Sequence, residues 1–161
     1  MKGFQGERMA TSGEEKRPDP HLGEIGGRLE RALRDAKEIV LATRRRDGST
    51  SRGAPVWFWY DGERVYFTVA PDSHKARRIA RGSPVFGRAG GAGGVTFSGD
   101  CSPVSDLRTV EEIGRMYGQK YWIAWLGFFR PRPSRIAAGK TLMFCFTPRA
   151  TAPDQGSGTR D

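Results

Sequence analysis

Cysteine and histidine are scarce in this sequence, which has two residues of each type among its 161. Cys101 and Cys145 lie far apart and lack the close spacing of metal ligands, so the sequence favours neither a metal site nor a disulfide framework. Free cysteines are often buried as small apolar side chains, and the strand-like flanks of these two predict that environment.

The sequence also lacks a long apolar run. A membrane-spanning helix needs about 20 predominantly apolar residues, and no such stretch occurs. Residues 1–18 have no apolar segment of the kind that a secretory signal requires. We therefore expect a cytoplasmic protein that has reduced thiols and makes no contact with a membrane.

Acidic residues are absent between Ile113 and Pro153, although the formal net charge of the whole chain is +9. Such a charge suits nucleic acid, a membrane surface or an anionic small molecule. No known nucleic-acid motif is present, so the charge by itself predicts generic electrostatic binding and no specific nucleic-acid partner. The basic residues in the acid-free stretch are Arg115, Lys120, Arg130, Arg132, Arg135, Lys140 and Arg149.

Both ends of the chain are rich in small, polar and charged residues. Segments 1–20 and 150–161 have few large apolar side chains, so burial cannot offset the entropy of ordering them. We expect two disordered tails around one domain that spans residues 21–149.

The pattern of apolar residues predicts a mainly β fold. Apolar residues three and four apart indicate an amphipathic helix over Leu22–Lys37. Two Asp-Gly pairs mark hairpin turns, at Asp47-Gly48 and Asp61-Gly62. Two further helices are predicted, over 73–81 and 109–117, and the glycine-rich segment 87–94 is expected to be a bulge or loop. The predicted strands are 38–45, 52–60, 64–69, 84–88, 95–104 and 141–147. Six short antiparallel strands with peripheral helices favour a small barrel.

The segment 66–82, YFTVAPDSHKARRIARG, concentrates hydroxyl groups and positive charge where a strand ends and a helix begins. Ser73 is suited to cap the helix, and Thr68 and Lys75 lie close to it in the sequence. Pairing across the Asp61-Gly62 turn would bring Arg52 beside residues 69–70. Together these groups would form a phosphate site, although a solvated basic helix face is the alternative.

The segment 54–59, APVWFW, interrupts a strand with a proline. Pro55 removes a backbone donor, which marks a sheet edge or a bulge and leaves backbone groups free to meet a ligand. Trp57 and Trp59 share one face of this strand, while Val56 and Phe58 share the other. Core packing explains at least one of these faces.

Side chains suited to catalysis are missing. There is no Ser–His–Asp set, the histidines His21 and His74 belong to no cluster, and no Gly-Lys-Ser/Thr follows Gly90–Gly94. If the protein is an enzyme, a bound cofactor must supply its chemistry.

Three segments in this order resemble the flavin-binding split-barrel superfamily, which contains pyridoxamine 5′-phosphate oxidase and the deazaflavin-dependent oxidoreductases. They are VLATRRRDGS at 40–49, SRGAPVWFWYDGERVYFT at 51–68 and SHKARRIARGSPV at 73–85, and the final strand TLMFCFTPRA is also similar. The resemblance implies a six-stranded antiparallel FMN-binding split barrel that forms a homodimer with cofactor sites at its interface.

The same resemblance implies the roles of particular residues. The cofactor phosphate would be bound by Arg52, Thr68, Ser73 and Lys75. His74 stands where an arginine is common in the family, which weakens one contact. The backbone of Pro55, Val56 and Trp57 would run along the ring of the flavin or deazaflavin.

We therefore expect an oxidoreductase that transfers hydride between bound FMN or F420 and a small organic substrate. The PVWF sequence and the acid-free stretch, which would suit the anionic tail of F420, give a slight preference for F420. A carrier that binds the cofactor without turnover is the alternative. Haem degradation is disfavoured because His74 is the only histidine expected in an ordered segment, and therefore the only candidate axial ligand. The aromatic segment 121–133 is expected to be dimer interface, substrate lid or core.

Overall fold

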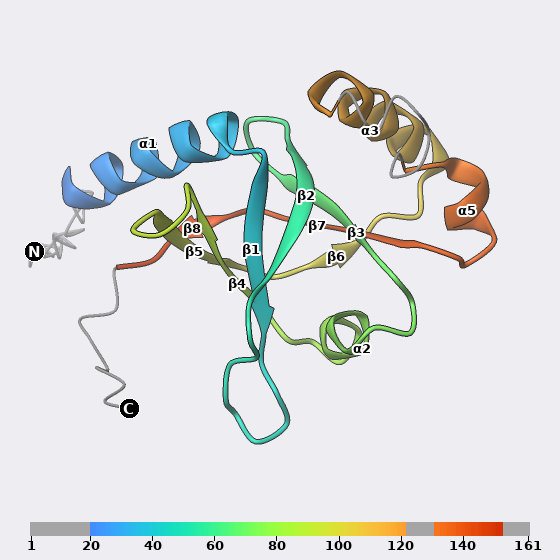
Figure 1. Cartoon of the computed structure of the whole chain (residues 1–161), viewed down its shortest axis with the longest axis horizontal. Helices are drawn as coiled ribbons and strands as arrows, with labels where there is room; N and C mark the ends of the chain where they lie inside the picture. The colour runs from blue at the N-terminus through green and yellow to red at the C-terminus, as the bar shows by residue number, and fades with distance from the viewer. Residues whose placement is uncertain (1–19, 122–130, 153–161) are drawn as a thin grey trace, which may run out of the picture.

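The computed structural model describes residues 20–121 and 131–152, in which a curved antiparallel sheet is flanked by helices (Figure 1). The helices are α1 (Pro20–Asp35), α2 (His74–Ala80), α3 (Leu107–Lys120) and α5 (Pro133–Ala137). The strands are β1 (Glu38–Thr43), β2 (Ala54–Tyr60), β3 (Val65–Val69), β4 (Val85–Ala89), β5 (Val95–Gly99), β6 (Ser102–Pro103), β7 (Leu142–Phe146) and β8 (Arg149–Ala150).

The described sheet has eight strands where the sequence predicted six, because β5 and β6 flank an interruption at Asp100–Cys101 and β7 and β8 flank one at Thr147–Pro148. The sheet order is β6-β7-β3-β2-β1-β4-β5-β8, so β6 and β8 lie at its two ends. β5 pairs with β8 in the same register in which β6 pairs with β7: continuing from Phe97 opposite Ala150 leads to Ser102 opposite Cys145. The segment 95–103 therefore runs along 144–150 and closes the barrel, as the sequence predicted.

Both hairpin turns occur where the Asp-Gly pairs predicted them, and in both a carboxylate organises the loop. Asp61 accepts hydrogen bonds from the backbone N–H groups of Glu63 and Arg64, at 2.8 and 2.7 Å. Gly62 has a φ of 100°, a conformation that favours glycine. The loop therefore contains four residues between Tyr60 and Val65, which face each other across it.

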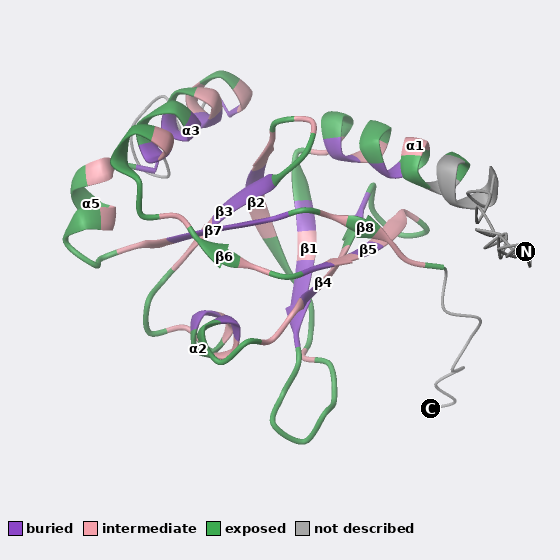
Figure 2. Ribbon diagram, turned by 180° about the vertical axis from the view of Figure 1, so that it is seen from behind, coloured by how far each residue is buried: buried purple, intermediate pink, exposed green. Residues whose placement is uncertain are grey.

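Inside the barrel lies the main apolar core. Alternate residues of the strands point inward, among them Leu41, Phe58, Phe67, Phe97 and Phe146. α1 covers one end of the barrel with Leu29 and Leu33, and α2 contributes Ile79. Figure 2 shows the buried positions on the strands and on the helix faces that are turned toward them.

A second core covers the outer face of β2, β3 and β7. α3 packs Val110, Ile113 and Tyr117 against Tyr66 and Met143, and the side chains of Trp57, Trp59 and Ile136 border this cluster. Asp106 caps α3 by accepting hydrogen bonds from Thr109. The aromatic residues of β2 thus pack on both faces of the strand, as the core interpretation expected.

The glycine-rich segment 87–94 contains the end of β4 and the turn that joins β4 to β5. Gly90, Gly91 and Gly93 have positive φ. Gly87 lies within β4, where a Cβ atom would come within 2.4 Å of the ring of Phe97, so only glycine fits beside that ring.

Several boundaries differ from those that the sequence predicted. The strand expected over 95–104 is interrupted at Asp100 and Cys101, and α3 runs beyond both ends of the helix expected over 109–117. α5 was not predicted. Pro20 begins α1 and Ala150 lies in β8, although both were placed in the expected tails; residues 1–19 and 153–161 lie outside the described part. None of the described helices has the length and apolar character to cross a membrane.

Candidate functional site

Ser73, His74 and Lys75 lie where the chain leaves β3 and enters α2. Ser73 caps the helix as predicted, since its Oγ accepts a hydrogen bond from the N–H of Ala76 at 3.1 Å. A turn in which the N–H of Ser73 bonds the carbonyl of Ala70 joins this cap to the end of β3. The hydroxyl proton of Ser73 is not used by the cap and remains available to donate to a ligand.

Lys75 is half-buried, and its burial lowers the pKa of its ammonium group. The ion pairs within the described ranges are Arg34–Glu30 and Arg149–Asp100, so no described carboxylate neutralises Lys75. His74 is exposed beside it. A desolvated cation without an acidic partner is an environment that an anionic group would stabilise.

Thr68 and Trp57 lie on the same outer face of the barrel. The ladder between β2 and β3 ends with Phe58 opposite Phe67, and one further step places Trp57 opposite Thr68. Directly opposed residues project to the same face of a sheet. Both side chains are half-buried, and Thr68 lies five residues before the Ser73 cap.

The predicted register between β2 and β3, which was used to place Arg52, was wrong by three to four residues. The sequence interpretation used a register that would place Arg52 beside residues 69–70, whereas the described ladder pairs Phe58 with Phe67 and ends there. The four-residue loop at Asp61 is longer than the tight turn that the Asp-Gly pair predicted, and this length contributes to the shift. Arg52 is exposed and precedes β2, and the preceding Ser51 is fixed to Thr43 by a backbone bond of 2.7 Å.

The three β2 residues expected along the cofactor ring have different environments. Pro55 is exposed, Val56 packs against the barrel interior, and Trp57 packs on the outer face. All three pair with β1 on one side, while the described ladder to β3 begins only at Phe58. Strands β2 and β3 therefore separate at Trp57 and Thr68.

Two tyrosines pack on this face: Tyr117, which sequence reasoning missed, and Tyr121, which begins the aromatic segment 121–133 and lies in the core, while residues 122–130 are outside the described part. Tyr121 stacks on Trp57, with ring centroids 4.3 Å apart and 4° between the planes. The hydroxyl of Tyr117 donates to the carbonyl of Trp57 at 2.8 Å, and the hydroxyl of Tyr121 donates to the carbonyl of Lys37. The four-residue spacing of the two tyrosines was a helical signal, but the predicted helix ended at Tyr117.

Burial changes the acidity of this cluster. It raises the pKa of Tyr121 to about 12 and that of Tyr117 well above its ordinary value, so both hydroxyl groups keep their protons at neutral pH. Burial lowers the pKa of Lys120 to about 8. The ammonium group of Lys120 donates to the carbonyl of Phe58 at 3.1 Å and lies 3.4 Å from the centre of the Phe58 ring.

The two thiols lie in different cores. Cys101 borders the barrel interior and Cys145 belongs to the outer core; both are free, and burial raises the pKa of both, in Cys101 to about 12. Within the described residues no group of three or more potential ligands is placed to hold a metal ion. The described groups thus offer binding chemistry: hydroxyl donors, cations, backbone and an aromatic platform.

The profile of one protein family, described as pyridoxamine 5′-phosphate oxidase, matches residues 25–152. The chain belongs to the pyridoxamine 5′-phosphate oxidase family. This membership covers the whole described barrel and confirms the resemblance drawn from the sequence. No curated protein matches the sequence.

Solved structures similar to this pyridoxamine 5′-phosphate oxidase family member have different names. An F420 reductase is 21% identical, with a TM-score of 0.51 over 76% of this chain and 93% of that one. The haem storage protein HutZ from Vibrio cholerae is 14% identical, with a TM-score of 0.52 over 82% and 92%. General stress protein 26 from Bacillus anthracis is 15% identical, with a TM-score of 0.53 over 74% and 88%. At these identities the likeness establishes the fold alone.

Proposed function

We propose that this protein is an oxidoreductase that binds FMN or F420 and transfers hydride between it and a small organic substrate. The observation that carries the proposal is the half-buried Lys75, which has no described acidic partner and follows the Ser73 cap at the point where β2 and β3 separate. The resemblance and the family membership lead to the same class of protein.

The cofactor phosphate would lie against the start of α2. Lys75 would supply the charge, while the hydroxyl groups of Ser73 and Thr68 would donate hydrogen bonds. Arg52 would approach from the segment before β2, and the exposed His74 would add at most one contact. The fit rests on the desolvated ammonium group of Lys75, which a phosphate would stabilise more than water does.

The cofactor ring would lie along Pro55, Val56 and Trp57, where β2 runs beyond its ladder with β3. Because Val56 points into the barrel, its contribution would come from the backbone. Tyr117 and Tyr121 would hold this strand in place through the carbonyl and the ring of Trp57. The bound cofactor would supply the hydride chemistry, and the protein would position it and exclude water.

F420 is slightly favoured over FMN. The PVWF sequence and the acid-free stretch from Ile113 support it. We also propose a homodimer with the cofactor sites at its interface, which would cover the half-buried Trp57 and Trp59 on the outer face. A non-catalytic carrier is the alternative function, since the groups of the described site are suited to binding and none of their contacts requires turnover.

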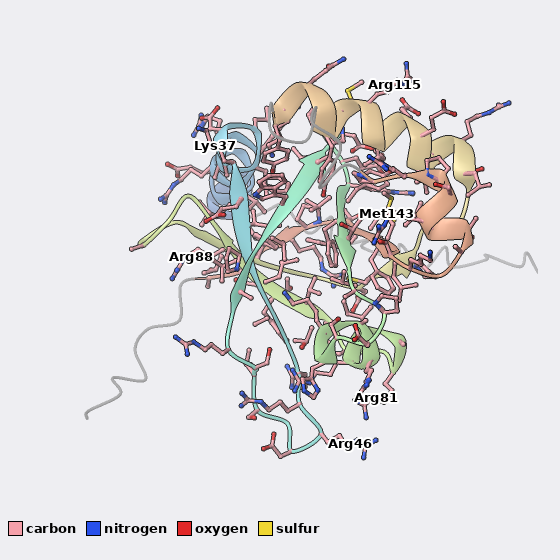
Figure 3. The ribbon with its side chains drawn as sticks, turned by 45° about the vertical axis from the view of Figure 1, so that its right-hand side comes forward. Lys37, Arg46, Arg81, Arg88, Arg115 and Met143 are labelled. Carbon is pink, nitrogen blue, oxygen red and sulfur yellow. The ribbon has the colours of Figure 1, made fainter. Side chains whose placement is uncertain are left out.

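Titration of the purified protein with FMN and, separately, with F420 tests the proposal. Lys75→Gln should weaken binding of the preferred cofactor by about 1–3 kcal/mol, the scale of a lost charge-assisted hydrogen bond. Lys37→Gln is the matched control, because the exposed Lys37 lies at the opposite end of the molecule from α2 (Figure 3). Equal affinity of Lys75→Gln and the wild type would refute the phosphate site.

Turnover distinguishes the enzyme from the carrier. The reduced cofactor bound to the protein is mixed with a panel of electrophilic small molecules, and its reoxidation is followed by absorbance. The oxidoreductase should reoxidise the cofactor faster with at least one substrate than free cofactor does under the same conditions. Tight binding without such acceleration across the panel would favour the carrier.

A further inference from the structure

Five arginines line a pocket that the proposed cofactor site does not use. The pocket has a volume of about 280 Å³ and lies between the β1–β2 hairpin and the last turn of α2. Figure 3 shows Arg46 and Arg81 at this end of the molecule. Arg44, Arg45, Arg46, Arg78 and Arg81 line the pocket together with residues 82–84.

These five charges lack acidic partners in the part of the chain that the structure describes. Both described ion pairs, Arg34–Glu30 and Arg149–Asp100, involve other residues. The acidic residue of the hairpin, Asp47, accepts hydrogen bonds from the N–H and hydroxyl groups of Ser49. These hydrogen bonds lower the pKa of Asp47, and the charge of Arg45 makes a smaller contribution. Arginine stays protonated at any physiological pH, so the repulsion among the five guanidinium groups is permanent.

Hydrogen bonds between distant segments fix the walls of the pocket. The N–H of Arg44 donates to Oγ of Ser83 at 2.9 Å, and Ser83 in turn donates to the carbonyl of Pro84. A guanidinium nitrogen of Arg78 reaches Oγ1 of the buried Thr43 at 3.5 Å. These contacts join the hairpin to the end of α2 across more than 30 residues of sequence, so the two segments that carry the arginines are held side by side before any ligand binds.

The pocket is distinct from the proposed phosphate site at the other end of the same helix. Lys75 lies in the first turn of α2 and Arg81 follows its last residue. Arg81 stands six positions after Lys75, which corresponds to a rise of about 9 Å at 1.5 Å per residue. The pocket therefore extends beyond the proposed function and concerns a second anionic group.

We propose that this arginine pocket binds an oligophosphate group, two or more linked phosphates, of a small ligand. Guanidinium groups bind phosphate oxygens in a bidentate manner, and five of them exceed what one phosphate can neutralise. The volume lies just below the roughly 300–1,000 Å³ of ordinary ligand sites, which favours a compact ligand. A nucleic acid would instead need an extended basic surface of roughly 600 Å² or more.

Calorimetric titration of the full chain with inorganic tripolyphosphate tests the proposal, and an adenosine diphosphate titration shows whether a nucleoside adds affinity. Arg46→Gln/Arg81→Gln should weaken tripolyphosphate binding by at least about tenfold, as expected for lost charge-assisted bonds. Arg28→Gln/Arg31→Gln, which changes the net charge equally on exposed positions of α1, should leave it within about twofold. Thermal unfolding of both double variants verifies that they are folded.

Four outcomes would overturn the proposal. These are the absence of binding by the wild type, equal losses in both double variants, tighter binding of a short DNA duplex that depends on the same arginines, and displacement of tripolyphosphate by FMN or F420. The last would make the pocket part of the cofactor site. Lys75→Gln separates the two proposals, because it should weaken cofactor binding and leave tripolyphosphate binding intact.

Discussion

Replacing Tyr117 with phenylalanine removes one oxygen atom from the contact between α3 and the barrel. Tyr117 is 1% exposed, and its hydroxyl donates to the carbonyl of Trp57 at 2.8 Å and lies 3.4 Å from the carbonyl of Tyr66. Tyr117→Phe removes this donor from the Trp57 carbonyl at a contact in which the Tyr117 side chain is almost fully buried. Such a loss costs about 1–3 kcal/mol of unfolding free energy. At about 2–4 °C per kcal/mol for a domain of this size, a loss of 2 kcal/mol lowers Tm by about 4–8 °C.

Urea unfolding followed by tryptophan fluorescence measures this loss, with Tyr60→Phe as the matched control. Tyr60 also donates to a backbone carbonyl, that of Gly62 at 2.9 Å, but it is half-buried beside an exposed turn. Water can replace that bond, so Tyr60→Phe should cost less than about 1 kcal/mol. Equal costs for the two variants, or a cost below about 0.5 kcal/mol for Tyr117→Phe, would refute the argument that burial sets the difference.

Two further predictions concern packing and pH. Gly87→Ala should destabilise the protein by about 1–3 kcal/mol in urea unfolding, because its Cβ would lie 2.4 Å from the Phe97 ring. Gly118→Ala, in an open position of α3, should instead stabilise the protein by about 0.5–1 kcal/mol. A more stable Gly87→Ala than Gly118→Ala would contradict the packing around Gly87. Lys120 has a pKa of about 8 in the folded protein, below the roughly 10.4 of an unfolded lysine. Between about pH 8 and about pH 10.4 the unfolded state therefore binds more protons than the folded state. The contribution of Lys120 to the free energy of unfolding accordingly rises with pH in this range. The wild type should therefore gain stability relative to Lys120→Met between pH 7 and 9.5, and a constant difference would show that Lys120 is not desolvated.

The strands of the barrel were predictable because their pattern is local. Apolar alternation and the two Asp-Gly pairs fixed the positions of β1, β2 and β3 within a few residues. The register between β2 and β3 was not predictable to the residue, because the side chain of Asp61 lengthens the turn by hydrogen bonds that the Asp-Gly pair does not specify.

The candidate site was predictable only in part for the same reason. Ser73 and Lys75 are three residues or fewer from the helix start that defines their role, and the Ser73 cap is confirmed. The support that Tyr117 and Tyr121 give to Trp57 joins positions about 60 residues apart, and nothing near either end of that contact reveals it. The arginine pocket likewise depends on a meeting of the hairpin with α2 that no local pattern encodes.

The long ladder that closes the barrel also determines when the protein can fold during its synthesis on the ribosome. The strands from β1 to β5 all precede residue 100, but the segment that joins β3 to β5 begins at Leu142. A nascent chain that has not yet reached β7 exposes one unpaired edge on β3 and another on β5, and open strand edges are prone to pair with other chains. The chain is therefore vulnerable to aggregation until its last described strands emerge, and premature termination before β7 would leave that vulnerability permanent.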